Sequence, residues 1–182
     1  MPRIRTGYSF RSAAGSLEDV MARIKHCGFT KAAMTDRAST FGYNKWSKLC
    51  RENDIDAVFG IELAVAESYE EKKPSVDHWL FLAIDDIEPI NDLLNLATQQ
   101  FRYQPIITYE QAMAAEGVNR VFGHRCKLDL VEPQERLFYG LGPASSRGHV
   151  RRAKQKGFSF AATSDNRFSN AEDVGFYEVL VG

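Results

Sequence analysis

The sequence predicts an α/β domain built around a mostly parallel sheet or barrel. Apolar runs of strand length alternate along the chain with segments whose apolar residues recur at helical spacing. This alternation is typical of folds in which helices connect parallel strands. Several strand-like runs end in polar residues, and in such folds the functional site lies at the carboxyl ends of the strands. The chain has 182 residues, so we expect 1–182 to form a single domain.

The helices are predicted from their caps and apolar faces. The first begins at Ser16, an N-cap serine followed by acidic residues, and it ends at Gly28. Thr108 is the expected N-cap of a later helix that stops at Gly117. We predict helices over 16–28, 41–53, 87–101, 108–116, 145–156 and 170–180. In the second of these, Phe41, Trp46 and Leu49 form the expected apolar face.

The strands are predicted from short apolar runs between these helices. A loosely alternating strand that leads into a loop is expected at the start of the chain, over 3–10. Further strands are expected over 31–36, 57–65, 78–84, 121–122, 137–141 and 158–163. The polar segment 67–77 is expected to be a loop or a hairpin tip.

Composition excludes several classes of protein. The chain is 44% hydrophobic and 26% charged, as a globular domain is. Its net charge of −1 argues against a nucleic-acid-binding surface over the whole chain. We find no apolar run of about eighteen residues, so no membrane association is expected. Three cysteines without paired spacing favour a reducing, cytoplasmic setting.

Acidic residues and a histidine fall at or near the ends of four predicted strands. They are Asp36, Glu62, His124 and Asp165. Carboxylates and imidazoles that converge at one edge of a sheet are typical of a metal site. His26 and His149 stand outside this pattern, and we expect them to be surface residues.

The order of these motifs resembles the polymerase and histidinol phosphatase (PHP) domain, most closely the version at the N-terminus of the bacterial DNA polymerase III alpha subunit. That version opens with His-x-His and Ser-x-Tyr-Ser, where this chain has Arg3-Ile4-Arg5 and Thr6-Gly7-Tyr8-Ser9. The later matches are Thr35-Asp36-Arg37, Gly60-Ile61-Glu62, His78-Trp79-Leu80, Gly123-His124 and Thr163-Ser164-Asp165-Asn166-Arg167. The resemblance implies a distorted seven-stranded α/β barrel, here somewhat shortened because 128–157 is shorter than usual.

The resemblance also implies which positions would hold up to three metal ions, and arginine occupies several of them. The replaced ligand positions are Arg3, Arg5, Arg37 and Arg167, whereas the family ligand positions Asp36 and Asp165 are retained. Either Arg11 or Ser12 would supply the remaining ligand of one outer site. A guanidinium offers no lone pair to a metal, but it pairs with carboxylates in bidentate geometry. We therefore expect these arginines to neutralise Asp36, Glu62 and Asp165 in place of the outer metals.

The middle site of the family corresponds to Glu62, His78 and His124. Two histidines and one glutamate form a known zinc ligand set, so one zinc or manganese ion is the alternative to a domain without cofactor. A nearby Arg3 or Arg5 would compete for Glu62 and repel a cation.

Three functions remain open from the sequence. The first is a catalytically impaired PHP-like domain with a structural or partner-binding role, its partner being a polymerase or another replication protein. The second is a single-metal phosphoesterase. The third is a module that binds phosphate or nucleic acid, for which Arg147, Arg151, Arg152 and Lys154 supply a basic helix.

Overall fold

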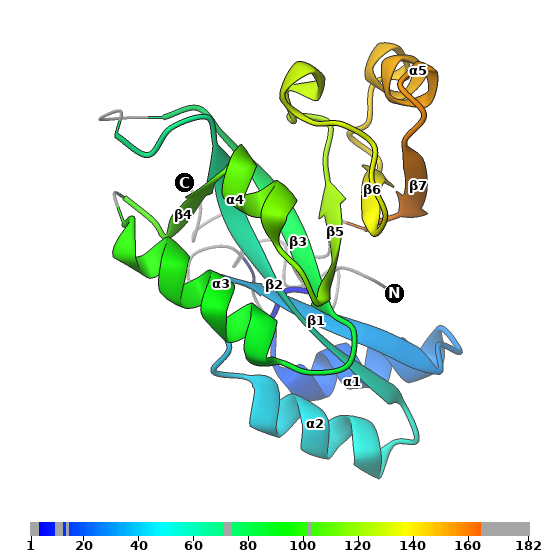
Figure 1. Ribbon diagram of the computed structural model, residues 1–182. Coiled ribbons are helices and arrows are strands. Elements are labelled where there is room, and N and C mark those ends of the chain that lie inside the picture. Colours follow the sequence, from blue (N-terminus) through cyan, green and yellow to red (C-terminus); the bar gives the residue numbers. More distant parts are fainter. Residues whose placement is uncertain (1–3, 10–12, 14, 71–73, 102, 165–182) are drawn as a thin grey trace. The chain divides into compact units, whose positions relative to one another are not determined.

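A computed structural model describes residues 4–9, 13, 15–70, 74–101 and 103–164 (Figure 1). These residues fall into two compact units. The first comprises the described residues up to Ile61 together with Ser164, and the second runs from Glu62 to Thr163. The prediction that 1–182 forms one domain therefore stays a prediction, and the two units are described in turn.

Helix α1 of the first unit, Leu17–His26, begins where the sequence predicts. The Ser16 hydroxyl accepts a hydrogen bond from the Asp19 amide at 3.1 Å, and the Asp19 carboxylate accepts one from the Ser16 amide at 3.3 Å. This reciprocal capping box satisfies two amides that would otherwise lack partners. The helix buries its apolar face, which consists of Leu17, Val20, Met21 and Ile24.

Strand β1, Lys31–Arg37, and helix α2, Tyr43–Glu52, complete the regular structure of this unit before β2. The strand predicted over 3–10 is reduced, in its described part, to one parallel bridge between Ile4 and Met34. The expectation that Phe41 belongs to the apolar face of α2 is wrong. Phe41 lies before the helix and is 87% exposed, because α2 begins only at Tyr43.

Strand β2, Asp56–Ala66, continues from the first unit into the second. The other strands are β3 (Val76–Ala83), β4 (Ile106–Thr108), β5 (Val118–Phe122), β6 (Leu137–Leu141) and β7 (Ser159–Ala162). The described sheet has seven strands in the order β1-β2-β3-β5-β6-β7, with β4 paired to β2. Strand pairs β2–β4, β5–β6 and β6–β7 are parallel, whereas β3–β5 is antiparallel. The predicted α/β class is confirmed.

Three helices and one short 3-10 turn connect the strands of the second unit. They are α3 (Glu88–Gln99), α4 (Tyr109–Ala114), η1 (Leu128–Leu130) and α5 (Arg147–Gln155). Thr108 caps α4 as predicted, in a capping box with Gln111. None of the helices in the described ranges is long and apolar enough to cross a membrane. The helix predicted over 170–180 lies outside the described residues.

Aromatic side chains form the centre of the second unit. The Trp79 ring is fully buried and lies 5.8 Å from the Tyr109 ring and 5.4 Å from the Phe122 ring, centroid to centroid. Phe122 in turn contacts Tyr139 edge to face at 5.6 Å. Such tilted and edge-on arrangements bring the positive edge of one ring to the negative face of the next. They fix the strand ends from which the polar residues described below project.

Candidate functional site

The retained carboxylate Asp36 lies at the end of β1, fully buried, and is held by the opening loop. Its Oδ1 accepts hydrogen bonds from the Thr6 amide at 2.6 Å and from the Ser9 hydroxyl at 2.5 Å. Its Oδ2 accepts one from the Thr6 hydroxyl at 2.8 Å. The Ser9 hydroxyl oxygen also accepts a bond from the Arg37 amide at 2.9 Å. Asp36 therefore fixes the loop on which Arg5 stands.

Burial and the neighbouring charge act on the pKa of the Asp36 carboxyl in opposite directions. Burial is the largest influence and raises the pKa of the Asp36 carboxyl, while the bonds from Ser9 and Thr6 and the charge of Arg5 lower it. The net pKa is above the ordinary value of 3.8. Arg5 is itself only 1% exposed, so it is no solvated surface residue. Arg37 is half-buried.

The three residues of the predicted middle site all lie in the second unit. Glu62 is fully buried in β2, and His78, partly buried, belongs to the neighbouring strand β3. His124 follows the end of β5. The antiparallel register pairs Leu80 with Val121, and continued beyond the paired residues it sets the start of β3 beside the segment that carries His124. The strand order thus brings His78 and His124 to the same end of the sheet.

A buried polar cluster lies at this end of the sheet, and sequence reasoning missed it. Its buried members are Asp77, Tyr109, Cys126 and Tyr139, and the half-buried His149 contacts two of them. The Cys126 thiol and the Tyr109 hydroxyl are hydrogen-bonded, and the charge of Asp77 raises the pKa of both groups and of the Tyr139 hydroxyl. Burial is the larger cause in each case, and it raises the pKa of Cys126 so far that the thiol stays protonated at neutral pH. Cys126 and the two tyrosines thus lie within reach of the charge of Asp77, and the cluster offers no thiolate as nucleophile.

His149 is the member of this cluster for which the sequence prediction is wrong. We expect a surface residue from the sequence, but both ring nitrogens are engaged: Nδ1 lies 3.0 Å from the Tyr139 hydroxyl and Nε2 lies 3.0 Å from the Cys126 carbonyl oxygen. A carbonyl can only accept, so Nε2 carries the proton and donates. The only sequence signal for the cluster was the carboxylate of Asp77 directly before His78.

The basic helix α5 has two charged faces. Arg152 pairs with Asp129 at 3.3 Å, and Lys156 pairs with Glu132 at 3.0 Å. Arg147, Arg151 and Lys154 recur at spacings of four and three residues, so they share a different face of the helix. All three are exposed, and none forms an ion pair with a described residue.

Comparison with known proteins assigns the fold of this chain to a family. The model of the PHP domain matches residues 2–174. The chain belongs to the PHP domain family. A solved structure from Bifidobacterium adolescentis, described as a metal-dependent phosphoesterase, superposes with a TM-score of 0.63 over 91% of this chain and 86% of that chain. Its sequence identity is 11%, so this likeness concerns the fold alone.

Curated relatives of this PHP domain are DNA polymerase III alpha subunits. The subunit from Chlamydia trachomatis is 31% identical over 109 residues, which is 55% of this chain and 9% of that protein. The one from Borreliella burgdorferi is 27% identical over 114 residues, which is 57% of this chain and 10% of that protein. This chain therefore spans about a tenth of the length of the curated relatives it matches. The predicted resemblance is confirmed.

The described residues of this PHP domain do not fit a metal centre. Each carboxylate oxygen offers about two lone-pair directions, and three donors from Thr6 and Ser9 engage three of the roughly four that Asp36 has. Across the described ranges, no three side chains of His, Cys, Asp or Glu gather in a group that could hold a metal ion. The predicted positions Arg3, Arg11, Ser12, Asp165 and Arg167 lie outside the described residues.

Proposed function

We propose that this PHP domain has lost phosphoesterase activity and serves as a structural or partner-binding module linked to DNA replication. The observation that carries the proposal is the state of Asp36. Its carboxylate, a retained ligand position of the family, is enclosed by the Thr6 amide and by two hydroxyls. Hydrolysis of phosphoesters in metal-dependent enzymes needs the ion to generate hydroxide and to stabilise charge. A carboxylate that accepts three hydrogen bonds has about one lone-pair direction left with which to hold such an ion.

The arginine positions support the same proposal. Arg5 is buried in the first unit, and its charge lowers the pKa of Asp36. A buried guanidinium supplies the positive charge that a metal would otherwise supply, without taking lone pairs. We extend this role to Arg3, Arg37 and Arg167, opposite Glu62 and Asp165, in keeping with their ligand positions in the sequence. Residues 1–182 then act as one domain.

The link to replication rests on the relatives. All three of the curated relatives found are DNA polymerase III alpha subunits, which this chain matches over about a tenth of their length. We propose that the partner is a polymerase or another replication protein, and that the domain acts in the cytoplasm.

The metal content of the purified chain is the first test. We expect no zinc, manganese or iron above background when protein purified without chelator is analysed by inductively coupled plasma mass spectrometry, because arginine charge replaces the outer ions. The variants His78→Ala and His124→Ala should give the same background as the wild type. His26→Ala provides the matched control, since His26 is an exposed histidine of α1.

The opposite result is equally informative. About one metal ion per chain, present in His26→Ala and lost in both other variants, would overturn the proposal. It would support instead a single-metal phosphoesterase that uses Glu62, His78 and His124. Assays on phosphomonoesters and DNA ends would then follow.

Helix α5 favours a second function, which is binding of a nucleic-acid backbone. Its exposed face of Arg147, Arg151 and Lys154 carries three positive charges that no described carboxylate neutralises. Arg152 contributes less, because it is paired with Asp129. Contacts to phosphate release condensed counterions, so binding through three charges should weaken with salt at a log–log slope of about −2.7.

Fluorescence anisotropy with labelled duplex DNA tests this function. The triple substitution Arg147→Ala, Arg151→Ala and Lys154→Ala should remove most of the binding and flatten the salt dependence. The matched control removes three exposed charges from the first unit, namely Lys25, Lys48 and Arg51. If both triple variants lose affinity equally, α5 is not a binding site.

A further inference from the structure

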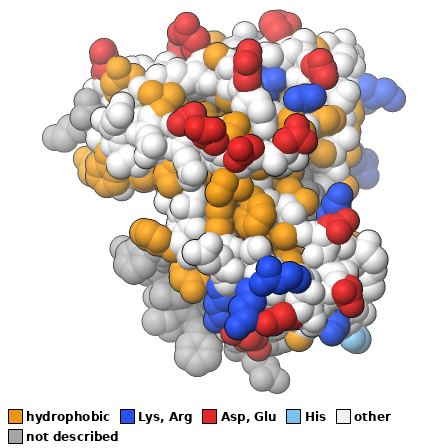
Figure 2. Space-filling model, turned by 60° about the horizontal axis from the view of Figure 1, so that its bottom comes forward, with side chains coloured by type: hydrophobic (Ala, Val, Ile, Leu, Met, Phe, Trp, Pro, Cys, Tyr) orange, Lys and Arg blue, Asp and Glu red, His pale blue; other side chains and the backbone are white. Residues whose placement is uncertain are grey.

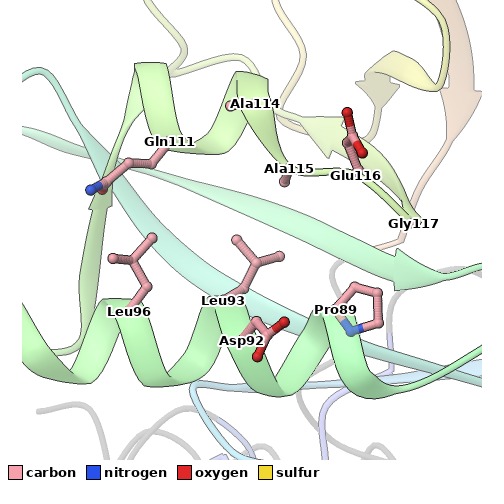
Figure 3. A pocket seen from close by; sticks show the side chains of 9 residues that line it. All are labelled: Pro89, Asp92, Leu93, Leu96, Gln111, Ala114, Ala115, Glu116 and Gly117. Atoms are coloured by element: carbon pink, nitrogen blue, oxygen red, sulfur yellow. The ribbon is translucent and has the colours of Figure 1, made fainter.

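A groove runs between helices α3 and α4 of the second unit, with a volume of about 510 Å³ (Figure 3). Its wall is largely apolar and is formed by Pro89, Leu93, Leu96, Ala114 and Ala115. In Figure 3 the side chains of Leu93 and Leu96 point from α3 toward α4. The volume falls within the range of about 300–1,000 Å³ that is typical of ligand sites.

Gly117 closes one end of this groove in a conformation that only glycine adopts readily. Its φ is +69°, and a Cβ at this position would lie 2.7 Å from Cγ of Pro89. The turn after α4 therefore sits directly against the start of α3. This close approach fixes one end of the groove.

The segment that forms the groove is strongly acidic, although the chain as a whole is nearly balanced with 24 acidic and 23 basic residues. Between residues 85 and 117 the acidic side chains are Asp85, Asp86, Glu88, Asp92, Glu110 and Glu116, and the one basic residue is Arg102. All six acidic side chains are exposed, and none forms an ion pair with a described residue. Asp92 and Glu116 line the groove itself.

Large hydrophobic side chains extend the apolar surface beyond both ends of α3. Ile87 precedes the helix and is 39% exposed, while Phe101 and Tyr103 follow it and are 53% and 66% exposed. Figure 2 shows one face of the molecule, on which hydrophobic side chains are exposed among acidic and basic ones. Exposed apolar surface with a polar rim is typical of a protein-binding site.

We propose that this groove docks a cationic amphipathic helix of a partner protein. Apolar side chains of that helix would enter between Leu93, Leu96 and Ala114, and its lysines or arginines would face the unpaired carboxylates of Asp92 and Glu116. The lining residues belong to α3, to α4 and to the turn after α4, so the groove offers an extended peptide no strand edge to pair with. A helix satisfies its own backbone and needs only side-chain contacts.

This inference deepens the partner-binding part of the proposed function, and it is tested with a probe of defined chemistry. The probe is a fluorescent peptide of about 18 residues, with leucines at positions i, i+3, i+4 and i+7 and lysines elsewhere. We expect saturable binding to the full chain, with the largest amide shifts in ¹⁵N NMR spectra between residues 89 and 117. A second peptide with serine for leucine should bind at least about tenfold more weakly, because it cannot fill the apolar wall.

Charge reversal in the groove provides the matched comparison. The double variant Asp92→Lys and Glu116→Lys should lose at least about tenfold in affinity. The control, Glu52→Lys and Glu70→Lys, makes the same change in net charge at exposed sites outside the groove and should stay within about twofold of the wild type. Equal losses in both double variants, or equal binding of the serine peptide, would show charge attraction alone and overturn the proposal.

Two further measurements separate the remaining outcomes. A dimer in light scattering that the groove variant abolishes would assign the face to a second copy of this chain and overturn the proposal of a partner helix. Metal content is measured on the same samples. A metal-loaded chain that binds the peptide would overturn the loss of phosphoesterase function but keep the groove, whereas a metal-free chain that does not bind would overturn the groove alone.

Discussion

Replacing Asp36 with alanine should lower the free energy of unfolding by about 3–5 kcal/mol, as removal of one member of a buried charged network does. The change removes the acceptor of three hydrogen bonds from Thr6 and Ser9. It also removes a negative charge that lies near the buried guanidinium of Arg5. Urea denaturation followed by tryptophan fluorescence measures the effect.

A matched control separates this network from a general effect of removing an aspartate. Asp56 at the start of β2 is exposed and lies 3.8 Å from Lys31, so Asp56→Ala should cost less than about 1 kcal/mol. Ser9→Ala removes one hydroxyl donor and should cost about 1–2 kcal/mol. If Asp36→Ala is no more destabilising than Asp56→Ala, the carboxylate does not organise the opening loop, and the central support for the proposed function is lost.

The contribution of Asp36 to the free energy of unfolding should fall as the pH rises. Burial raises the pKa of Asp36 above 3.8, so the folded state holds this proton more tightly than the unfolded state does. The stability from this group is fully present below pH 3.8 and is lost as the pH rises through the raised value. The stability of the wild type relative to that of Asp36→Asn should therefore be greater near pH 3.8 than at neutral pH.

Local patterns in the sequence predicted most of the regular structure. Ser16 and Thr108 each combine an N-cap side chain with a hydrogen-bonding residue three positions later, and both helices begin where these signals place them. The predicted strand 31–36 ends at Asp36, and the observed strand continues one residue further. These features depend on neighbours within a few residues, so a single sequence contains them.

The features that the sequence did not predict depend on distant contacts. Thr6 and Ser9 lie 30 and 27 residues from Asp36, and His149 lies 23 residues from the Cys126 carbonyl that it contacts. No local pattern distinguishes His149 from a surface histidine. Phe41 fits a helical apolar face by spacing, but the helix begins after it. The hydrogen bonds around Asp36 and His149 could therefore not be predicted from the sequence, and the ligand positions of the candidate site stay a prediction.

The second large loss of stability is expected for Arg120, a residue that the sequence analysis did not single out. It lies in β5, is only 5% exposed, and donates to the Met113 carbonyl, to the Gln134 side chain at 3.1 Å and to the Glu135 carbonyl at 2.8 Å. These acceptors are neutral, and burial lowers the pKa of the guanidinium. One side chain thus ties the end of α4 to the loop before β6. Arg120→Ala should destabilise the chain by about 3–5 kcal/mol, because it opens a cavity and leaves buried acceptors unsatisfied.

Two further substitutions separate the contribution of the hydrogen bonds of Arg120 from that of its packing. Arg120→Met keeps much of the packing and removes a buried charge, so it should cost only about 1–3 kcal/mol, from the carbonyls of Met113 and Glu135 that lose their donor. Arg152→Ala removes an exposed arginine that pairs with Asp129 at 3.3 Å and should cost less than about 1 kcal/mol. Hydrogen exchange should show faster opening of β5 and of residues 134–137 in Arg120→Ala, a smaller effect in Arg120→Met and none in Arg152→Ala. A loss in Arg120→Met as large as in Arg120→Ala would mean that donation to the carbonyls outweighs packing. A loss in Arg120→Ala as small as in Arg152→Ala would mean that Arg120 does not hold these elements together.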